Sequence, residues 1–549
     1  MRSSLSVMAL VLSVFTSNWL SAQETPAKSA TAQRTFRGAA DCLRCHAAGI
    51  PKEADPALAD AGFTAEKLTD DSWVLLDEIK IWIASDRHSQ AFTALKNERS
   101  KHMGKLLGVA EIHRDKRCLA CHTGFPLSAM GDDPRLLSAD LVDTLKVAQG
   151  VSCEGCHSAS GDAATNPEAN KGWYVPHVNK DSWRFLSSKD KFEKYGFADI
   201  RLPSTRTRLC LSCHLGNAAE GKVVTHEMYA AGHPPLPGFE MESFAQQMPK
   251  HWRDFHKKAE PVRQEFLKKN ADDIYGRDSY KLDNLHETNV VLVSALVAFS
   301  ENLKLASDLA DEKLSVPVAK PDFPELSLFE CYACHHDLKD RSWRQSRKLH
   351  GAPGRPMLRA WPTVLTKLAL KRLGGPAEEF DRQMQSVDKL LNDQPFGRRD
   401  RWAEAVKPVT EWLDQQAHTL ERKPLPRAEG MQLLRDIVAV ADSELWDYDS
   451  ARQLVWASQI LRRELSTKSS PDEVKALVAT MDAELAGVEK LFALNLLDGK
   501  KAQQQIPGST KTREVTEVDL TKSLTPIGAY DAVEFRDKFH ALAGKLSAK

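Results

Sequence analysis

The chain has little that would mark it as a nucleic-acid-binding or membrane-spanning protein. Its 549 residues include 75 basic and 75 acidic side chains, so no excess of positive charge is available for nucleic acid or an anionic membrane. Beyond the N-terminal segment, no apolar run is long enough to predict a membrane helix. No cysteine follows Cys334, so the C-terminal part has no thiol chemistry of its own. At this length we expect more than one domain.

The ten cysteines that are present all belong to one pattern. The sequence reads Cys-x-x-Cys-His five times, with no cysteine left over. The cysteine pairs are Cys42 and Cys45, Cys118 and Cys121, Cys153 and Cys156, Cys210 and Cys213, and Cys331 and Cys334; the histidines that follow them are His46, His122, His157, His214 and His335. Two thiols at this spacing can form thioether bonds to one haem, and the next histidine can bind its iron as the proximal ligand.

The alternatives to haem attachment explain the pattern less well. A zinc site or a redox dithiol does not require a histidine after every second cysteine. A disulfide framework would leave cysteines at other spacings. The five repeats therefore predict a multihaem c-type cytochrome that carries five covalently attached haems c.

The N-terminus has the features of a secretory signal peptide. Arg2 provides a positive start, residues 5–15 form an apolar core, and Leu20-Ser21-Ala22 is a plausible cleavage site before Gln23. The apolar run is short for a bilayer span, and no cysteine follows it that could carry a lipid anchor. We therefore expect a periplasmic or secreted protein, a location that also suits covalent haem attachment outside the bacterial cytoplasm.

Histidines outside the motifs are candidates for the second axial ligand that each low-spin haem needs. The chain has 18 histidines, of which five lie in the motifs and 13 do not. The distal ligands that we predict are His88, His177, His226, His233 and His286, with His251 or His102 as alternatives for the last position.

Local sequence supports these histidines to different degrees. His88 follows two possible helix caps, Ser85 and Asp86, and shares a helical face with Phe92 and Leu95. His177 ends an aromatic segment that starts at Trp173, and His226 and His233 stand seven residues apart. Pro234 disfavours a helix at His233, so we expect that side chain to come from a turn. His286 opens a long amphipathic segment that is either a ligand helix or a core helix.

The predicted fold is mainly α. A multihaem cytochrome domain would wrap around five haems and be followed by a helical domain. The predicted segments are a signal peptide at 1–22, a linker at 23–37, the pentahaem domain at 38–345 and a helical C-terminal domain of unknown role at 346–549. Ser470-Pro471-Asp472-Glu473 is a capping box that opens a helix to about Leu497. A polar stretch at 500–522 then leads to a last helix near 531–548.

Patterns that flank the motifs resemble the cytochrome c-554 family of multihaem cytochromes. They are Trp82…His88-x-x-Ala91-Phe92, Gly150-Val151-Ser152-Cys153-Glu154-x-Cys156-His157 with His177 behind it, and His226…Gly232-His233-Pro234. The resemblance covers residues 38–340. It implies a helical fold around closely packed haems, bis-histidine iron and electron transfer. The fifth motif and the long C-terminal half depart from the tetrahaem type, so the family's ligand pairing is not transferred.

Two functions are compatible with this sequence. We favour a carrier that passes electrons between redox partner proteins through mostly bis-histidine haems. The alternative is a haem-dependent oxidoreductase that acts on a small nitrogen or sulfur compound at one open iron. The pentahaem nitrite reductases typically have a lysine in their catalytic motif, and no Cys-x-x-Cys-Lys occurs here. The C-terminal half is a candidate for docking onto a redox complex.

Overall fold

A computed structural model describes residues 34–46, 76–492, 499–505, 512–518 and 520–547, with short gaps. The gaps are 128–129, 132, 134, 145–146, 179–182, 184, 199, 253, 256–257, 271–272, 274–280, 282, 317, 319–320, 337, 341, 348–350, 376 and 468–469. The predicted signal peptide and most of the predicted linker therefore lie outside the described residues. Within the described part the protein is mainly helical, as predicted, with one two-stranded sheet.

The N-terminal part consists of short helices joined by turns. They are α1 (Ala39–His46), α4 (Glu78–Ser85), α5 (Ala91–Ala94), α6 (Glu98–Leu106), α7 (Lys116–His122), α8 (Ala139–Thr144), α9 (Cys153–His157) and α11 (Ser188–Tyr195), with 3-10 turns η1 (Arg87–Gln90), η2 (Ile112–Arg114), η4 (Val147–Gln149) and η5 (Pro176–Val178). Helices this short bury little apolar surface of their own, and the buried clusters here are small, such as the one that contains Phe92, Leu119 and Leu137.

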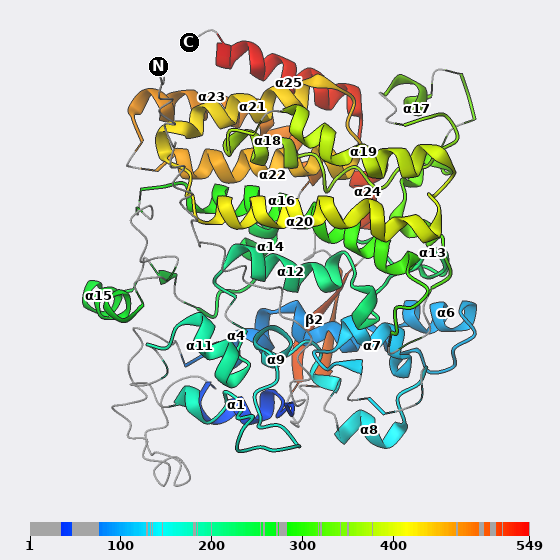
Figure 1. Ribbon diagram of the computed structural model, residues 1–549, viewed down its shortest axis with the longest axis vertical. Helices are drawn as coiled ribbons and strands as arrows, with labels where there is room; N and C mark the ends of the chain where they lie inside the picture. The colour runs from blue at the N-terminus through cyan, green and yellow to red at the C-terminus, as the bar shows by residue number, and fades with distance from the viewer. Residues whose placement is uncertain are drawn as a thin grey trace, which may run out of the picture.

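The rest of the molecule contains the long helices of the chain, which lie in stacked layers, together with several short ones (Figure 1). They include α12 (Pro203–His214), α13 (His226–Ala230), α14 (Met241–Gln247), α15 (Glu260–Lys269), α16 (His286–Ala310), α17 (Trp343–Ser346), α18 (Thr366–Arg372), α19 (Ala377–Asp393), α20 (Trp402–Glu421), α21 (Gly430–Ser443), α22 (Tyr448–Leu465), α23 (Asp472–Phe492), α24 (Leu520–Gly528) and α25 (Ala532–Ser547); the shorter 3-10 turns are η6 (Ala218–Glu220), η9 (Leu326–Leu328), η10 (Cys331–Ala333), η11 (Arg399–Arg401) and η12 (Arg427–Glu429).

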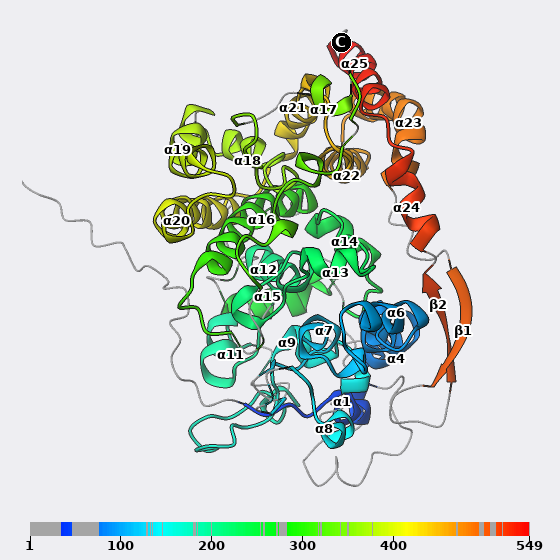
Figure 2. The same cartoon turned by 90° about the vertical axis from the view of Figure 1, so that its right-hand side faces the viewer.

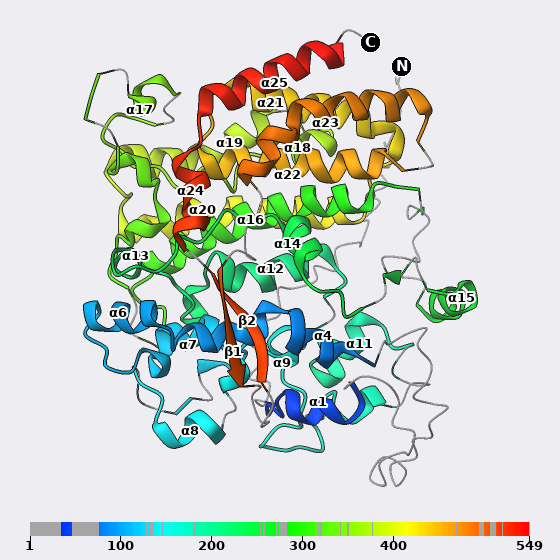
Figure 3. The ribbon, with the colours of Figure 1, turned by 180° about the vertical axis from the view of Figure 1, so that it is seen from behind.

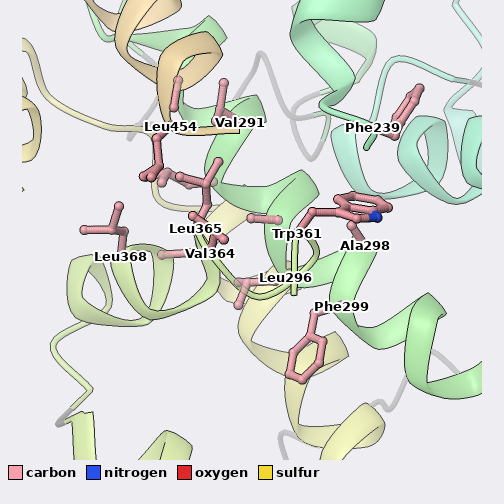
Figure 4. Close-up of a cluster of buried hydrophobic side chains, with 14 of the residues drawn as sticks. Phe239, Val291, Leu296, Ala298, Phe299, Trp361, Val364, Leu365, Leu368 and Leu454 are labelled. Atoms are coloured by element: carbon pink, nitrogen blue, oxygen red, sulfur yellow. The ribbon is translucent and has the colours of Figure 1, made fainter. Parts of the chain in front are cut away.

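Helix α16 is the centre of these layers. It packs against α12, α18, α20 and α22, and its Val293, Leu296 and Val297 are fully buried. By length and composition alone α16 could cross a membrane, but 72% of its apolar window is buried inside the protein. Figure 4 shows α16 side chains among others from the surrounding elements, such as Leu368 of α18 and Leu454 of α22. Of the two interpretations of the segment that His286 opens, the core helix is confirmed.

One continuous core reaches from α12 to the C-terminal helices. Its buried members run from Leu211, within the fourth motif, to Leu546 in α25. Buried hydrogen bonds also cross residue 345: Glu421 of α20 accepts hydrogen bonds from the backbone of Ser204 at 2.8 Å and from its hydroxyl at 3.2 Å. The helix that carries the fourth motif is therefore packed into the same core as α20 and α22.

The polar stretch after α23 forms an antiparallel hairpin of β1 (Gly499–Gln505) and β2 (Thr512–Val518). The hairpin runs down the side of the N-terminal part, next to α4 (Figures 2 and 3). Its Arg513 is buried and donates hydrogen bonds to Ile83 O at 2.5 Å, Ser89 Oγ at 2.8 Å and Ser89 O at 3.1 Å. A segment close to the C-terminus thus contacts the turn that carries His88.

Candidate haem sites

Four of the five motifs end a helix. His46 is the last residue of α1, His122 of α7, His157 of α9 and His214 of α12. A separation of three residues places both cysteines of a motif on the same side of such a helix. The fifth motif instead lies on the 3-10 turn η10 (Cys331–Ala333). All cysteines whose side chains the structure describes are free thiols, so none is used in a disulfide.

Three of these motif histidines face another histidine at nearly the same separation. The ring centres of His46 and His177 are 6.2 Å apart, with ring planes at 19°. For His214 and His88 the values are 6.3 Å and 83°, and for His335 and His226 they are 6.2 Å and 29°. These histidines come from distant parts of the chain, and the fold brings them together in pairs.

This separation fits a metal ion between two imidazoles. Metal–imidazole bonds are about 2 Å long, and a ring nitrogen lies roughly 1 Å from its ring centre, so two axial ligands have centres roughly 6 Å apart. The three pairs therefore have the spacing that an iron with two axial histidines requires.

His233 and His122 form a fourth pair, which is indicated by the effect of one histidine on the pKa of the other. His233 follows α13 in a turn, as predicted, and the pKa of His233 is lowered to about 4, mainly by burial and in part by the charge of His122. Burial likewise lowers the pKa of His122. Both imidazoles are thus held neutral, which is the form that binds a metal.

The third motif has an aromatic environment. The ring of His157 stacks on Phe197, with centres 5.1 Å apart and planes at 9°. Trp173 approaches the same imidazole edge-on at 6.4 Å. His157 also lies near His177, whose pKa burial lowers to about 4 with a contribution from the charges of His46 and His157. The predicted aromatic segment at Trp173 therefore lies between the first and third motifs.

The structure gives no support for His286 as a distal ligand. His286 is the first residue of α16, and its Nε2 lies 2.7 Å from Lys281 O. The nitrogen that would bind iron therefore faces a carbonyl oxygen instead. Of the alternatives, His102 is exposed on α6. The Nδ1 of His251 is buried without a hydrogen-bond partner among the described residues, and its charge acts on Asp86. Proximity to Asp86 makes His251 the better candidate of the two.

Hydrogen bonds orient five of the histidines described above. Two of them face a carboxylate: His46 Nδ1 lies 2.8 Å from Glu78 Oε2, and His88 Nδ1 lies 3.0 Å from Asp86 Oδ1. The other three face backbone carbonyl oxygens: His122 Nδ1 lies 2.6 Å from Ala91 O, and His233 Nδ1 lies 2.7 Å from Pro234 O. His177 Nδ1 lies 3.1 Å from Trp173 O and also beside Tyr174 O. Each partner oxygen accepts the Nδ1 proton, which leaves Nε2 as the nitrogen available to a metal. The flanking carboxylates Glu78 and Asp86 were not predicted for this role, although Asp86 was expected as a helix cap.

The motifs themselves lie in contact. Cys42 of the first motif and Cys153 of the third pack against the same buried cluster, and Cys153, followed by burial, raises the pKa of Cys42. The pKa of the Cys213 thiol is lowered, chiefly by the neighbouring Cys121. The first motif thus adjoins the third, and the second adjoins the fourth.

Two further features relate the motifs to one another. Burial, and then the charge of Cys210, raise the pKa of Cys156 to about 12, so the third motif lies near the fourth. His226 and His233, which face the fifth and second motifs, both belong to α13 and the turn that follows it. The histidines that face the fifth and second motifs thus come from one short segment of the chain.

The patterns that flank the motifs meet in space. Trp82 of α4 donates its indole hydrogen to Val151 O at 3.1 Å, and Val151 N donates to His88 O at 2.9 Å. Gly150 has a φ of +69°, and a Cβ there would lie 2.6 Å from His88 O. Only glycine allows this approach without strain. The loop before the third motif thereby fixes the backbone of His88.

Paired thiols before a histidine, together with facing imidazoles about 6 Å apart, are features by which c-type cytochromes hold haem. Residues 76–158 match the family model of cytochrome c554 and c-prime, so this segment of the chain is similar to that family. The matched segment contains α4, α7 and α9, the second and third motifs and His88. No curated protein and no solved structure matches the chain.

Proposed function

We propose that this protein is an exported pentahaem cytochrome that carries electrons between redox partner proteins. The cysteines of the five motifs hold the haems, and the motif histidines bind iron on one side. The distal ligands are His177 opposite His46, His88 opposite His214, His226 opposite His335 and His233 opposite His122. His251, which lies near Asp86, is the proposed distal ligand for the remaining iron, that of His157. Each bound haem supplies an iron that alternates between ferric and ferrous states by one electron.

The observation that carries this proposal is the common separation of three histidine pairs. Ring centres at 6.2–6.3 Å recur at the first, fourth and fifth motifs. Two histidines close both axial positions of an iron and leave none for a substrate, which is the arrangement that suits a carrier. The similarity of residues 76–158 to the cytochrome c554 and c-prime family also supports electron transfer.

Contacts between the motifs support a continuous route for electrons. The thiol contacts join the first motif to the third and the second to the fourth. Short separations between neighbouring centres favour rapid tunnelling, so electrons would follow the series first, third, fourth, second, fifth.

The fifth motif is the proposed point of exchange with a partner. His335 and His226 are exposed, whereas the other facing histidines are half-buried. Cys331 and Cys334 are also exposed, and the nearby Leu338 is 95% exposed. A centre at the end of the series and open to solvent is the one that another redox protein can approach.

The test is the electron paramagnetic resonance spectrum of the oxidised holoprotein, together with carbon monoxide binding to the reduced protein. A carrier with closed irons is expected to give only low-spin signals and no carbon monoxide adduct. A high-spin signal with a stoichiometric adduct would reveal an open iron, and the alternative, an oxidoreductase for a small nitrogen or sulfur compound, would replace the carrier. Mass spectrometry of the intact chain counts the covalent haems, for which we expect five.

A further inference from the structure

Two of the ligand histidines donate their Nδ1 proton to a carboxylate, and three donate it to a backbone carbonyl. The carboxylates are Glu78, 2.8 Å from His46, and Asp86, 3.0 Å from His88. Each haem site takes the number of its motif. The second site differs from the first and fourth, because both of its histidines, His122 and His233, face carbonyl oxygens. The five orienting contacts are therefore of two chemical kinds, distributed unevenly over the sites.

The kind of acceptor changes the imidazole as a ligand. A hydrogen bond to an ionised carboxylate is roughly twice as strong as one to a neutral acceptor. It draws the Nδ1 proton away from the ring and raises the basicity of Nε2. A more basic ligand favours ferric iron over ferrous iron, so the reduction potential falls.

Burial strengthens this effect at Asp86. Its side chain is only 6% exposed, against 18% for Glu78, and electrostatic interactions are less screened away from water. Asp86 is also fixed in place, because its Oδ1 accepts the backbone hydrogen of His88 at 2.9 Å while its own carbonyl accepts the Ser89 hydroxyl at 2.6 Å. The carboxylate therefore faces His88 in a single defined position.

We propose that Glu78 and Asp86 give the first and fourth sites lower reduction potentials than the second site. This inference rests on the proposed haem ligation. Each reduction step adds one electron to one iron, and the Nδ1 proton stays between histidine and carboxylate in both states. In the series first, third, fourth, second, fifth, a partly reduced protein would then hold electrons at the second site in preference to the first and fourth.

The experiment is a spectroelectrochemical titration of the holoprotein and its variants. Asp86→Asn and Glu78→Gln replace a charged acceptor by a neutral one of nearly the same shape, which resembles the carbonyl contacts at the second site. Each variant is expected to move one of the low-potential steps upward and to leave the other steps in place. The shift is expected to be larger for Asp86→Asn, because Asp86 is the more deeply buried carboxylate.

Two further variants separate the hydrogen bond from charge and folding. Asp41→Asn removes a negative charge from the helix of His46 without touching an imidazole, since Asp41 pairs with Arg37 at 2.9 Å; its titration is expected to match the wild type. Asp86→Glu keeps the charge and is expected to retain the low potential. If Asp86→Asn does not assemble, the Glu78→Gln titration decides the question alone.

The outcomes distinguish this inference from the proposed function. A wild-type protein with fewer than five one-electron steps, or with an open iron, contradicts the proposed ligation. Five steps in the wild type that stay unchanged in both neutral variants, or that move as much in Asp41→Asn, overturn the role of the carboxylates and leave the carrier function standing.

Discussion

At the scale of single residues, the angle between facing imidazoles is an observable property of each site. The planes of His88 and His214 are nearly perpendicular at 83°, whereas those of His46 and His177 meet at 19°. Perpendicular planes leave the two iron orbitals that interact with the rings nearly equal in energy, and the low-spin resonance becomes strongly anisotropic. Nearly parallel planes separate these orbitals and give a rhombic signal. We expect both kinds of signal in the oxidised protein.

Replacement of His88 tests which histidine serves the fourth site. His88→Ala is expected to remove the strongly anisotropic signal and to add a high-spin signal with carbon monoxide binding at one iron. The matched control is His286→Ala, because the Nε2 of His286 faces Lys281 O at 2.7 Å. We expect the control to keep the wild-type spectrum. An open iron in His286→Ala with an unchanged spectrum in His88→Ala would reverse the assignment.

Glu242 on α14 provides a prediction of pH dependence. Burial, opposed by Arg206 at 3.8 Å, raises the pKa of Glu242 to about 7. An acid whose pKa is higher in the folded than in the unfolded chain stabilises the fold fully only below its unfolded pKa. The contribution of Glu242 to the free energy of unfolding therefore falls by roughly 3 kcal/mol between pH 4.5 and pH 7, because each unit of pKa difference corresponds to about 1.4 kcal/mol.

Glu242→Gln resembles the protonated, neutral form at every pH. We expect it to raise the thermal midpoint at pH 8 and to leave the midpoint at pH 4.5 nearly unchanged. The measurement is a pair of melting curves for each protein at the two pH values. Equal shifts at both pH values would show that the carboxylate does not titrate in this range.

At the scale of elements, local signals predicted helix ends better than they predicted the hairpin. The capping box led to a predicted helix at 471–497, and α23 begins at Asp472 and ends at Phe492 within the described residues. The last helix, α25, also lies where it was expected. The strands of the hairpin consist mainly of lysine, glutamine, glutamate and threonine without an apolar alternation, so their pairing depends on contacts that sequence periodicity does not show.

Arg513 is expected to hold the hairpin on the haem-binding part. Its guanidinium makes three hydrogen bonds to Ile83 and Ser89, and Arg513→Ala leaves those buried acceptors unsatisfied at a cost of roughly 1–3 kcal/mol. We expect a lower thermal midpoint and faster proteolysis within 499–518. Arg536→Ala is the control, since that arginine is paired with the neighbouring Asp537 on α25. Equal behaviour of the two variants would mean that Arg513 does not anchor the hairpin.

At the scale of the whole molecule, the candidate sites divide into a local and a non-local half. The cysteines and motif histidines are defined by a spacing of five residues, so a local pattern in the sequence is enough to predict them. The facing histidines are non-local. His177 and His226 approach His46 and His335 only after the chain has folded, and no periodicity links the partners. His286 was a candidate because it opens a segment predicted to be amphipathic, but the apolar residues of that segment form the core around α16.

The continuous core makes a prediction about the boundary near residue 345. Asp414 of α20 accepts hydrogen bonds from Arg208 at 2.9 Å, Ser300 at 2.8 Å and Lys304 at 2.8 Å, so three side chains on α12 and α16 depend on a residue beyond that boundary. A chain that ends at residue 345 would also leave the apolar surface of α16 uncovered, and exposed apolar area costs about 25 cal/mol per Å².

We therefore expect the chain that ends at residue 345 to aggregate and to lack the full complement of haems. In the full chain, we expect Asp414→Ala to lower the thermal midpoint while all five haems remain attached. Intact mass and sedimentation velocity provide the measurements. Asp400→Ala is the control for the single variant, because Asp400 pairs with Arg398 on the surface. A truncated chain that is monomeric, carries five haems and reproduces the redox titration of the full protein would show instead that the haem-binding part folds on its own and that the C-terminal helices are a separable domain.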